Sequence, residues 1–189
     1  MVNRNSYFMA VDVQNLWYSC RHIFGHEFRV DYKALLDFVI ECVVKGVDPV
    51  VNSTAYLVVS SNHDQTNFIN ALRQLDFNIK KRYFHFNKTR QPNTSGTSWD
   101  VGITADAFMQ DEEYDTLILI SGDGDFTYLI EPLRELGKDV IVVAFAESLS
   151  KQLAASATEV YTLSENIVYS PGKRFAAVQR ESQITTPTE

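Results

Sequence analysis

The sequence LILISGDGDF, residues 117–126, joins a run of apolar residues to a turn that contains two aspartates. The run lacks the in–out alternation of a half-exposed strand, which is typical of strands covered on both faces in a parallel sheet. Residues 128–136 then carry apolar side chains at helical spacing, and Gly137 is placed as a C-terminal helix cap. A second apolar run follows at 140–145. This order predicts a strand–helix–strand unit with a right-handed crossover.

The same alternation of strands and helices extends toward the N-terminus. Further apolar runs of strand length lie at 7–13, 55–60 and 80–86. Segments with apolar residues at helical spacing lie between them, at 31–45 and 68–75. Strands that alternate with helices predict an α/β fold with a mainly parallel, doubly wound sheet.

Length and composition limit the class of protein. The chain has 189 residues, which predicts a single domain, and its 45% hydrophobic residues are sufficient for a core. No apolar run reaches the roughly 18 residues of a membrane span, so no contact with a membrane is expected. The start of the sequence lacks the regions of a signal peptide, and Cys20 and Cys42 are too few for a disulfide framework or a zinc site. We therefore expect a reducing, cytoplasmic setting.

The net charge of −7 counts mildly against a nucleic-acid partner, because neutralising phosphates requires clustered lysines and arginines. Net charge says little about one local site, however. Cations bound by some of the carboxylates would also offset part of that charge. The acidic balance therefore does not exclude a nucleic-acid substrate.

Aspartates follow two of the predicted strands at the point where each strand ends. Asp12 ends the first strand, in AVDVQN, and Asp123 and Asp125 follow the strand predicted at 116–120. Ligands in open α/β sheets bind outside the carboxyl ends of the strands, near the point where the strand order reverses. Two separate strands therefore deliver carboxylates to the edge where a site is expected.

Each aspartate also has a purely structural explanation. Asp100 and Asp106 lie in SWDVGITADAF, a predicted helix, where Asp100 would complement the helix dipole and Asp106 would lie on a solvated face. Asp12 or Asn15 could cap the helix after the first strand, and Asp125 could cap the helix that follows it. This explanation is weakest for Asp12, because aspartate is disfavoured at the end of an apolar core strand.

As a group, the aspartates indicate a cation site. Two carboxylates about 4 Å apart repel by about 4 kcal/mol at an effective dielectric constant of about 20. Clustering several of them destabilises a fold unless a cation or a proton relieves the repulsion. Ligand sets made of oxygen alone suit Mg²⁺ or Mn²⁺, and such a metal can activate water and neutralise a phosphodiester. The sequence therefore predicts a divalent-metal site and a nuclease.

Three segments carry a family signature: FMAVDVQNLW (8–17), SWDVGITADAF (98–108) and LILISGDGDFTYLIEPLRELGKDVIVVAF (117–145). In this order and spacing they resemble the NYN domain, a branch of the PIN-like nuclease superfamily that includes LabA-like proteins. The resemblance covers roughly residues 7–163 and implies a three-layer, PIN-like α/β/α sandwich that cleaves RNA with a divalent metal. We place the nuclease domain at 1–165 and, because the chain then turns polar, a partly disordered tail at 166–189.

The resemblance implies four catalytic and metal-binding acids by motif position: Asp12, Asp100, Asp123 and Asp125. Asn15 and Asp106 match residues beside these acids, and we expect both to support the site. Ser121 is not in the context of a catalytic nucleophile, and we expect it to play a supporting role as well. One departure concerns the substrate: the family often has Lys-Gly-Val-Asp where this chain has TSWD at 97–100, so a lysine that could hold a phosphate is absent.

Basic residues before the helical motif are the candidates for binding a substrate. The segment 87–98 is predicted to be a long loop, and its Lys88 and Arg90 would have to replace the missing lysine. The cluster Lys80–Arg82 is followed by aromatic residues, a pattern that suits single-stranded RNA, although solvated charges beside a core strand are the more usual explanation. Trp99 could stack on a base of the substrate or anchor the start of the helix, and we expect the second.

The sequence thus predicts a ribonuclease that uses Mg²⁺ or Mn²⁺ to hydrolyse single-stranded RNA. Two alternatives stay open. One is a non-catalytic RNA-binding or protein-interaction module with the same fold, and the other is a phosphohydrolase that acts on DNA or a small phosphoester. The oligomeric state is also open, with a homodimer as one option.

Overall fold

The structure is a computed structural model that describes residues 6–44, 50–60, 64–84 and 98–171. Within these ranges, no helix has the length and apolar character needed to cross a membrane. Cys20 and Cys42 are both free, and Cys20 is buried.

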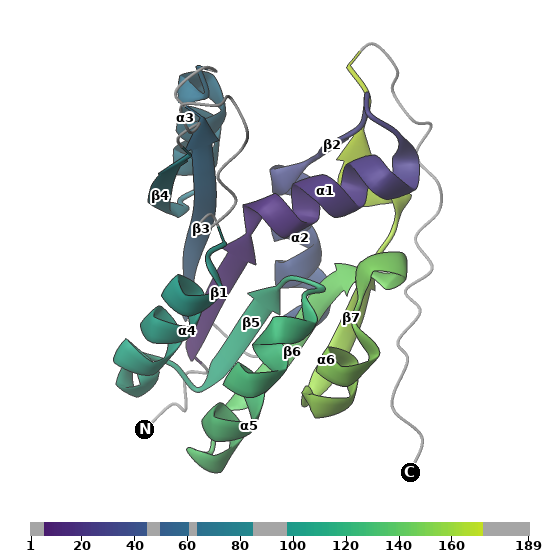
Figure 1. The fold of residues 1–189 in the computed structure, drawn as a ribbon. Helices are drawn as coiled ribbons and strands as arrows, with labels where there is room; N and C mark the ends of the chain where they lie inside the picture. Colours follow the sequence, from purple (N-terminus) through teal and green to yellow (C-terminus); the bar gives the residue numbers. More distant parts are fainter. Residues whose placement is uncertain (1–5, 45–49, 61–63, 85–97, 172–189) are drawn as a thin grey trace, which may run out of the picture.

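Six parallel strands form the central sheet in the order β4-β3-β1-β5-β6-β7 (Figure 1). They are β1 (Ser6–Asp12), β3 (Val50–Ser60), β4 (Asn78–Phe84), β5 (Thr116–Ile120), β6 (Asp139–Phe145) and β7 (Glu159–Leu163). The chain runs outward from β1 through β3 to β4, and then returns to the other side of β1 for the remaining strands. The strand order therefore reverses between β1 and β5, where α/β sheets bind ligands. The prediction of a doubly wound parallel sheet is confirmed.

Helices cover both faces of the sheet and complete the predicted three layers. One face packs against α1 (Val13–Phe24), α2 (Tyr32–Phe38) and α3 (Thr66–Gln74). The other face packs against α4 (Asp100–Met109), α5 (Thr127–Glu135) and α6 (Lys151–Ser156). In β1, Met9 and Val11 face the first layer while Phe8 and Ala10 face the second, and all four are buried. The strand is apolar at successive positions because both of its faces are covered.

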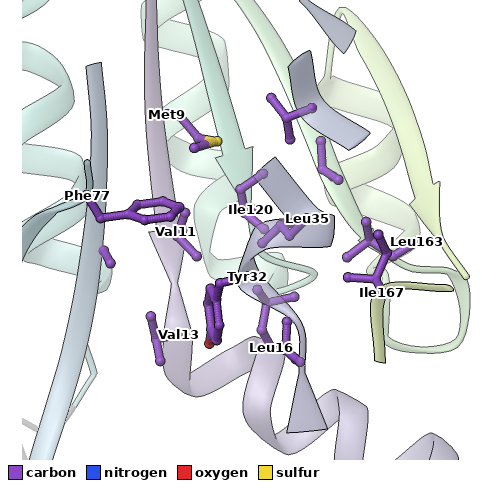
Figure 2. Packing of buried hydrophobic residues seen from close by; sticks show 14 of the residues in the cluster. Met9, Val11, Val13, Leu16, Tyr32, Leu35, Phe77, Ile120, Leu163 and Ile167 are labelled. Carbon is purple, nitrogen blue, oxygen red and sulfur yellow. The ribbon is translucent and has the colours of Figure 1, made fainter. Parts of the chain in front are cut away.

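The first core also includes the segment that follows β7. Met9 and Val11 lie in one cluster with Leu35 of α2 and with Ile167, as Figure 2 shows. Directly after Ile167, β8 (Val168–Tyr169) pairs antiparallel with β2 (Arg29–Val30). The first residues of the predicted tail thus pack on the domain, whereas 172–189 lie outside the described residues.

Other differences from the predicted elements are local. The helix predicted at 31–45 changes at its end from α2 into a π-helical turn at Val39–Val43. β3 and β4 both begin earlier than the apolar runs indicated, because polar residues continue each strand: the buried Ser53 and Thr54 in β3, and the exposed Asn78 in β4. The edge strand β7 was not predicted, since only two of its five residues are buried. Gly137 has a φ of +80°, which confirms the predicted cap after α5.

Candidate active site

A cleft of about 260 Å³ lies where β1 and β5 end. It is lined by residues from the start of α1, the start of α4 and the turn after β5: Asp12, Gln14, Asn15, Tyr18, Ser19, Ser98, Trp99, Asp100 and Asp123. The cleft therefore occupies the reversal point of the strand order, where the carboxylates were predicted to meet.

Asp12 lies at the end of β1 and is only 5% exposed. Its Oδ1 accepts a hydrogen bond from the Asn15 backbone N–H at 3.0 Å, so Asp12 does cap α1, as its structural explanation proposed. The pKa of this carboxyl is raised to about 6, mainly by burial and also by the nearby charges of Asp100 and Asp123, against the opposing effect of the cap bond. A buried carboxyl in this position is a poor choice for a cap alone, because ionising it is costly.

Short contacts hold the turn after β5 against α1 and against the loop after β6. Asn15 Oδ1 accepts a hydrogen bond from the Gly122 N–H at 3.1 Å, which ties α1 to the turn. On the other side, the Ser150 N–H donates to the Gly122 carbonyl at 3.0 Å. A Cβ at Gly122 would lie 2.4 Å from the carbonyl oxygen of Ser148, so only glycine allows this approach. The backbone that carries the next aspartate is therefore fixed from two sides.

Ser121 connects the carboxylates at the floor of the cleft. It is fully buried, and its Oγ accepts a hydrogen bond from the Asp123 N–H at 3.2 Å. The same hydroxyl lies 3.5 Å from Asp12 Oδ2, at the long limit of a hydrogen bond. Asp123 Oδ1 in turn accepts from the Asp125 N–H at 3.1 Å, so Asp123, and not Asp125, caps the helical turn that follows.

Three carboxylates converge beside the cleft, and two of them, Asp100 and Asp123, line it. One oxygen each of Asp100, Asp123 and Asp125 lies within 4.8 Å of the other two. Asp12 is not in this group, because the cap bond and Ser121 hold its side chain at the floor of the cleft. None of the ion pairs within the described part of the chain involves these four acids. An oxygen-only donor set of this kind fits Mg²⁺ or Mn²⁺, which take carboxylate ligands and retain further oxygen ligands from water or phosphate.

Trp99 fixes the start of α4 and, with it, the position of Asp100. Its Nε1 donates to the Leu57 carbonyl of β3 at 2.9 Å, and the ring is largely buried. The Arg82 guanidinium stacks 4.5 Å from the centre of the Trp99 ring and donates to the Ser98 carbonyl at 2.7 Å. The expectation that Trp99 anchors the helix is confirmed, and Arg82 joins the anchor.

Asp106 also lies on α4, but its carboxylate contacts residues of β3 and β4. It accepts hydrogen bonds from Tyr56 Oη and from Lys80 Nζ, each at 2.6 Å, and forms an ion pair with Lys80. Burial and this hydrogen bond raise the pKa of the Tyr56 hydroxyl far above its usual value. In this structure, Asp106 connects α4 to β3 and β4 and is not one of the converging carboxylates.

Several residues of the cleft were not predicted from the sequence. Gln14, Tyr18 and Ser19 lie on α1 beside Asn15, and Ser98 precedes α4. The helical spacing of three and four residues from Asn15 to Tyr18 and Ser19 is a signal that could have indicated them. Lys88 and Arg90, the predicted substrate-binding residues, lie outside the described residues.

The sequence model of the NYN domain family matches residues 8–164, which include the whole cleft. The chain belongs to this family. NYN domains are part of the PIN-like nuclease superfamily, whose members are generally nucleases, typically bind RNA and typically use divalent metals. The resemblance seen in the three sequence segments is therefore confirmed.

Two known proteins are similar to this NYN domain. The low amplitude and bright protein LabA of Synechococcus elongatus is 31% identical over 114 residues, which are 59% of this chain and 61% of LabA. The match thus spans less than two thirds of that relative. The crystal structure of a protein of unknown function from Vibrio parahaemolyticus has a TM-score of 0.74 and 27% identity, and the match covers 88% of this chain and 97% of that one. The likeness confirms the fold.

Proposed function

We propose that the chain is a ribonuclease that depends on Mg²⁺ or Mn²⁺ and hydrolyses phosphodiester bonds in single-stranded RNA at this cleft. The observation that carries the proposal is the convergence of Asp100, Asp123 and Asp125 within 4.8 Å of one another. The two segments that supply these acids are separate in the sequence and meet at the reversal point of the sheet. Membership in the NYN family supports the same chemistry.

Each acid has a distinct place in the proposed site. Asp100, Asp123 and Asp125 would hold the cation through their carboxylate oxygens, and Asp12 would add a fourth carboxylate from the floor of the cleft. A divalent cation bound there would activate a water molecule and neutralise the charge of the phosphodiester. The aspartates themselves keep other anions out of the cleft unless a cation is bound, since their charges have the same sign as a phosphate.

The surrounding residues position these acids. Asn15 and Ser121 hold the turn that carries Asp123, while Trp99 fixes the helix that carries Asp100. Fixed ligands matter because a displacement of about 1 Å in a catalytic group can reduce a rate by about 100-fold. The rigid support is thus part of the proposed site.

The test compares cleavage of end-labelled single-stranded RNA and DNA by the wild type and by Asp123→Asn, with Mn²⁺, Mg²⁺ or EDTA. We expect products from RNA with metal and none with EDTA. Asp123→Asn should lower the rate by more than the roughly 10- to 100-fold that is typical of residues that only orient a ligand. Glu131→Gln is the matched control, because Glu131 is an exposed acid on α5 outside the cleft, and it should cleave like the wild type.

The other outcomes are equally specific. Undiminished cleavage by a folded Asp123→Asn protein would remove the acidic cleft as the site. Cleavage of DNA alone, or of a small phosphoester alone, would identify a different phosphohydrolase. RNA binding that persists in EDTA without any product under any condition would identify a non-catalytic RNA-binding module, an alternative for which the missing lysine in TSWD at 97–100 is the motivation.

A further inference from the structure

Two large aromatic side chains are exposed on α1 beside the acidic cleft. Trp17 is 41% exposed and Tyr18 is 59% exposed. Tyr18 lines the same cleft as Asp12, Asp100 and Asp123. Single exposed apolar residues are common on protein surfaces, but an exposed tyrosine that lines a cleft offers its ring to a ligand bound there.

The pair is held in a fixed arrangement. The ring centres of Trp17 and Tyr18 are 4.8 Å apart, and the rings meet at 76°, edge to face. The Arg21 guanidinium lies 4.7 Å from the centre of the Trp17 ring, and Arg21 Nη2 forms a 2.8 Å hydrogen bond with His26 Nδ1. These contacts already restrict Trp17, and Trp17 supports Tyr18. The two side chains therefore lose little conformational entropy when a ligand stacks on them.

The position of Tyr18 suits a ligand that also reaches the acids. It lies six residues beyond Asp12 at the start of α1, which corresponds to about 9 Å along the helix axis. A ligand in the cleft can therefore contact the carboxylate end with one group and the tyrosine with another. Charge alone cannot supply the affinity, because the cleft is lined by acids and the chain is acidic overall.

We propose that Tyr18, supported by Trp17 and Arg21, is a stacking subsite for an unpaired nucleobase of the RNA whose phosphate lies at the acidic cleft. The inference rests on the proposed ribonuclease function and adds a reason for single-stranded substrates. Inside a duplex, both faces of each base are covered by neighbouring bases, so an exposed aromatic ring stacks on unpaired bases and not on internal base pairs. The subsite selects unpaired bases without reading which base is present, because every base has a π-face.

The test measures binding of a short fluorescently labelled single-stranded RNA by anisotropy, in an Asp123→Asn background so that the RNA stays intact. Tyr18→Ala should raise the dissociation constant by about 5- to 140-fold, as expected for the loss of one base–aromatic stack. Tyr18→Phe should bind within about twofold of the parent, because stacking needs the ring and not the hydroxyl. The matched control is Tyr128→Ala, which removes an 85% exposed tyrosine on α5 outside the cleft and should leave binding unchanged.

A second measurement reports binding beside Tyr18, at the Trp17 ring that contacts it edge to face. The chain has two tryptophans, Trp17 and Trp99, and Trp99 is only 9% exposed. Binding of the unlabelled RNA should quench tryptophan fluorescence in the parent and not in Trp17→Phe. Duplex RNA of the same sequence should neither quench it nor respond to Tyr18→Ala.

The outcomes separate this inference from the proposed function. If the wild type cleaves RNA and Tyr18→Ala binds as tightly as its parent, the subsite is wrong while the ribonuclease stands. If no cleavage occurs but Tyr18→Ala weakens binding, the subsite stands on a non-catalytic RNA-binding domain. Equal losses for Tyr18→Phe and Tyr18→Ala, or an equal loss on duplex RNA, overturn stacking, and an absence of RNA binding by every variant overturns both proposals.

Discussion

Asp12 combines a structural and a chemical property that oppose each other. As the cap of α1 it stabilises the helix, yet burial raises the pKa of its carboxyl from 3.8 to about 6, so its ionised form is unfavourable in the folded protein. A carboxyl whose pKa is raised in the folded state stabilises the fold fully only below its pKa in the unfolded chain, near 3.8. It loses this contribution as the pH rises through about 6. Ionised Asp12 therefore costs about 3 kcal/mol in the metal-free protein above pH 6, at 1.36 kcal/mol per pH unit.

Asp12→Asn removes the charge and keeps a good capping residue, so we expect it to stabilise the metal-free protein near neutral pH. In EDTA at about pH 7.5, the free energy of unfolding should rise by up to about 3 kcal/mol, and at about pH 4 it should change little. Urea denaturation at the two pH values measures the difference. Asp115→Asn is a control with the opposite pH dependence. Hydrogen bonds from Ser6 lower the pKa of Asp115, so its contribution to the free energy of unfolding is present above its pKa in the unfolded chain and is lost as the pH falls. Equal effects of Asp12→Asn at both pH values would contradict the prediction.

Among the elements, α4 depends on one close contact at its first turn. A Cβ at Gly102 would lie 2.6 Å from Cε3 of the Trp99 ring, which cannot move freely because it is buried and bonded to the Leu57 carbonyl. Gly102→Ala should therefore displace the ring and the adjacent Asp100. Overpacking costs about 1–3 kcal/mol, and the better helix propensity of alanine returns about 1 kcal/mol. We expect a net loss of up to about 2 kcal/mol in unfolding free energy and Mn²⁺ affinity weakened by about 10- to 100-fold.

Val101→Ala is the matched control for that prediction, because Val101 is on the same helix and 77% exposed. Denaturation and Mn²⁺ titration of both variants separate a local effect at Trp99 from a general effect on α4. Unchanged Mn²⁺ affinity in Gly102→Ala would mean that Trp99 does not position Asp100.

Strands were predictable from the sequence where burial on both faces gave them an unbroken run of apolar residues. β5 and β6 are buried over nearly their whole length, so their apolar runs identified them, and their parallel pairing followed from the helix between them. The edge strand β7 is half-exposed, and β2 and β8 have two residues each, so tertiary contacts rather than local pattern determine them. Tyr18 was missed although it follows Asn15 by three residues on α1: the spacing places it on the same helix face, and only the tertiary structure places that face at the cleft.

At the scale of the whole molecule, the strand order explains why the acids lie close together. Asp12, Asp123 and Asp125 were indicated by their place at the ends of predicted strands, and Asp100 by the resemblance of its segment to the NYN domain. The sequence did not indicate that β1 and β5 are adjacent, which is a property of the order β4-β3-β1-β5-β6-β7. A cation at Asp100, Asp123 and Asp125 would connect α4 to the turn after β5, two segments that only the folded chain brings together.

Such a cation should stabilise the whole molecule, because it binds the folded state and finds no assembled site in the unfolded chain. At a free concentration about 100 times the dissociation constant the gain is about 2.7 kcal/mol, which corresponds to a rise in Tm of about 5–10 °C for a domain of this size. We expect Mn²⁺ or Mg²⁺ to raise the Tm of the wild type and of Glu131→Gln, and EDTA to reverse the rise. Asp123→Asn should show little rise, because the turn then offers one charged ligand fewer. K⁺ at equal ionic strength controls for screening, and a wild-type Tm that responds alike to K⁺ and Mn²⁺ would show that the carboxylates do not form a specific site.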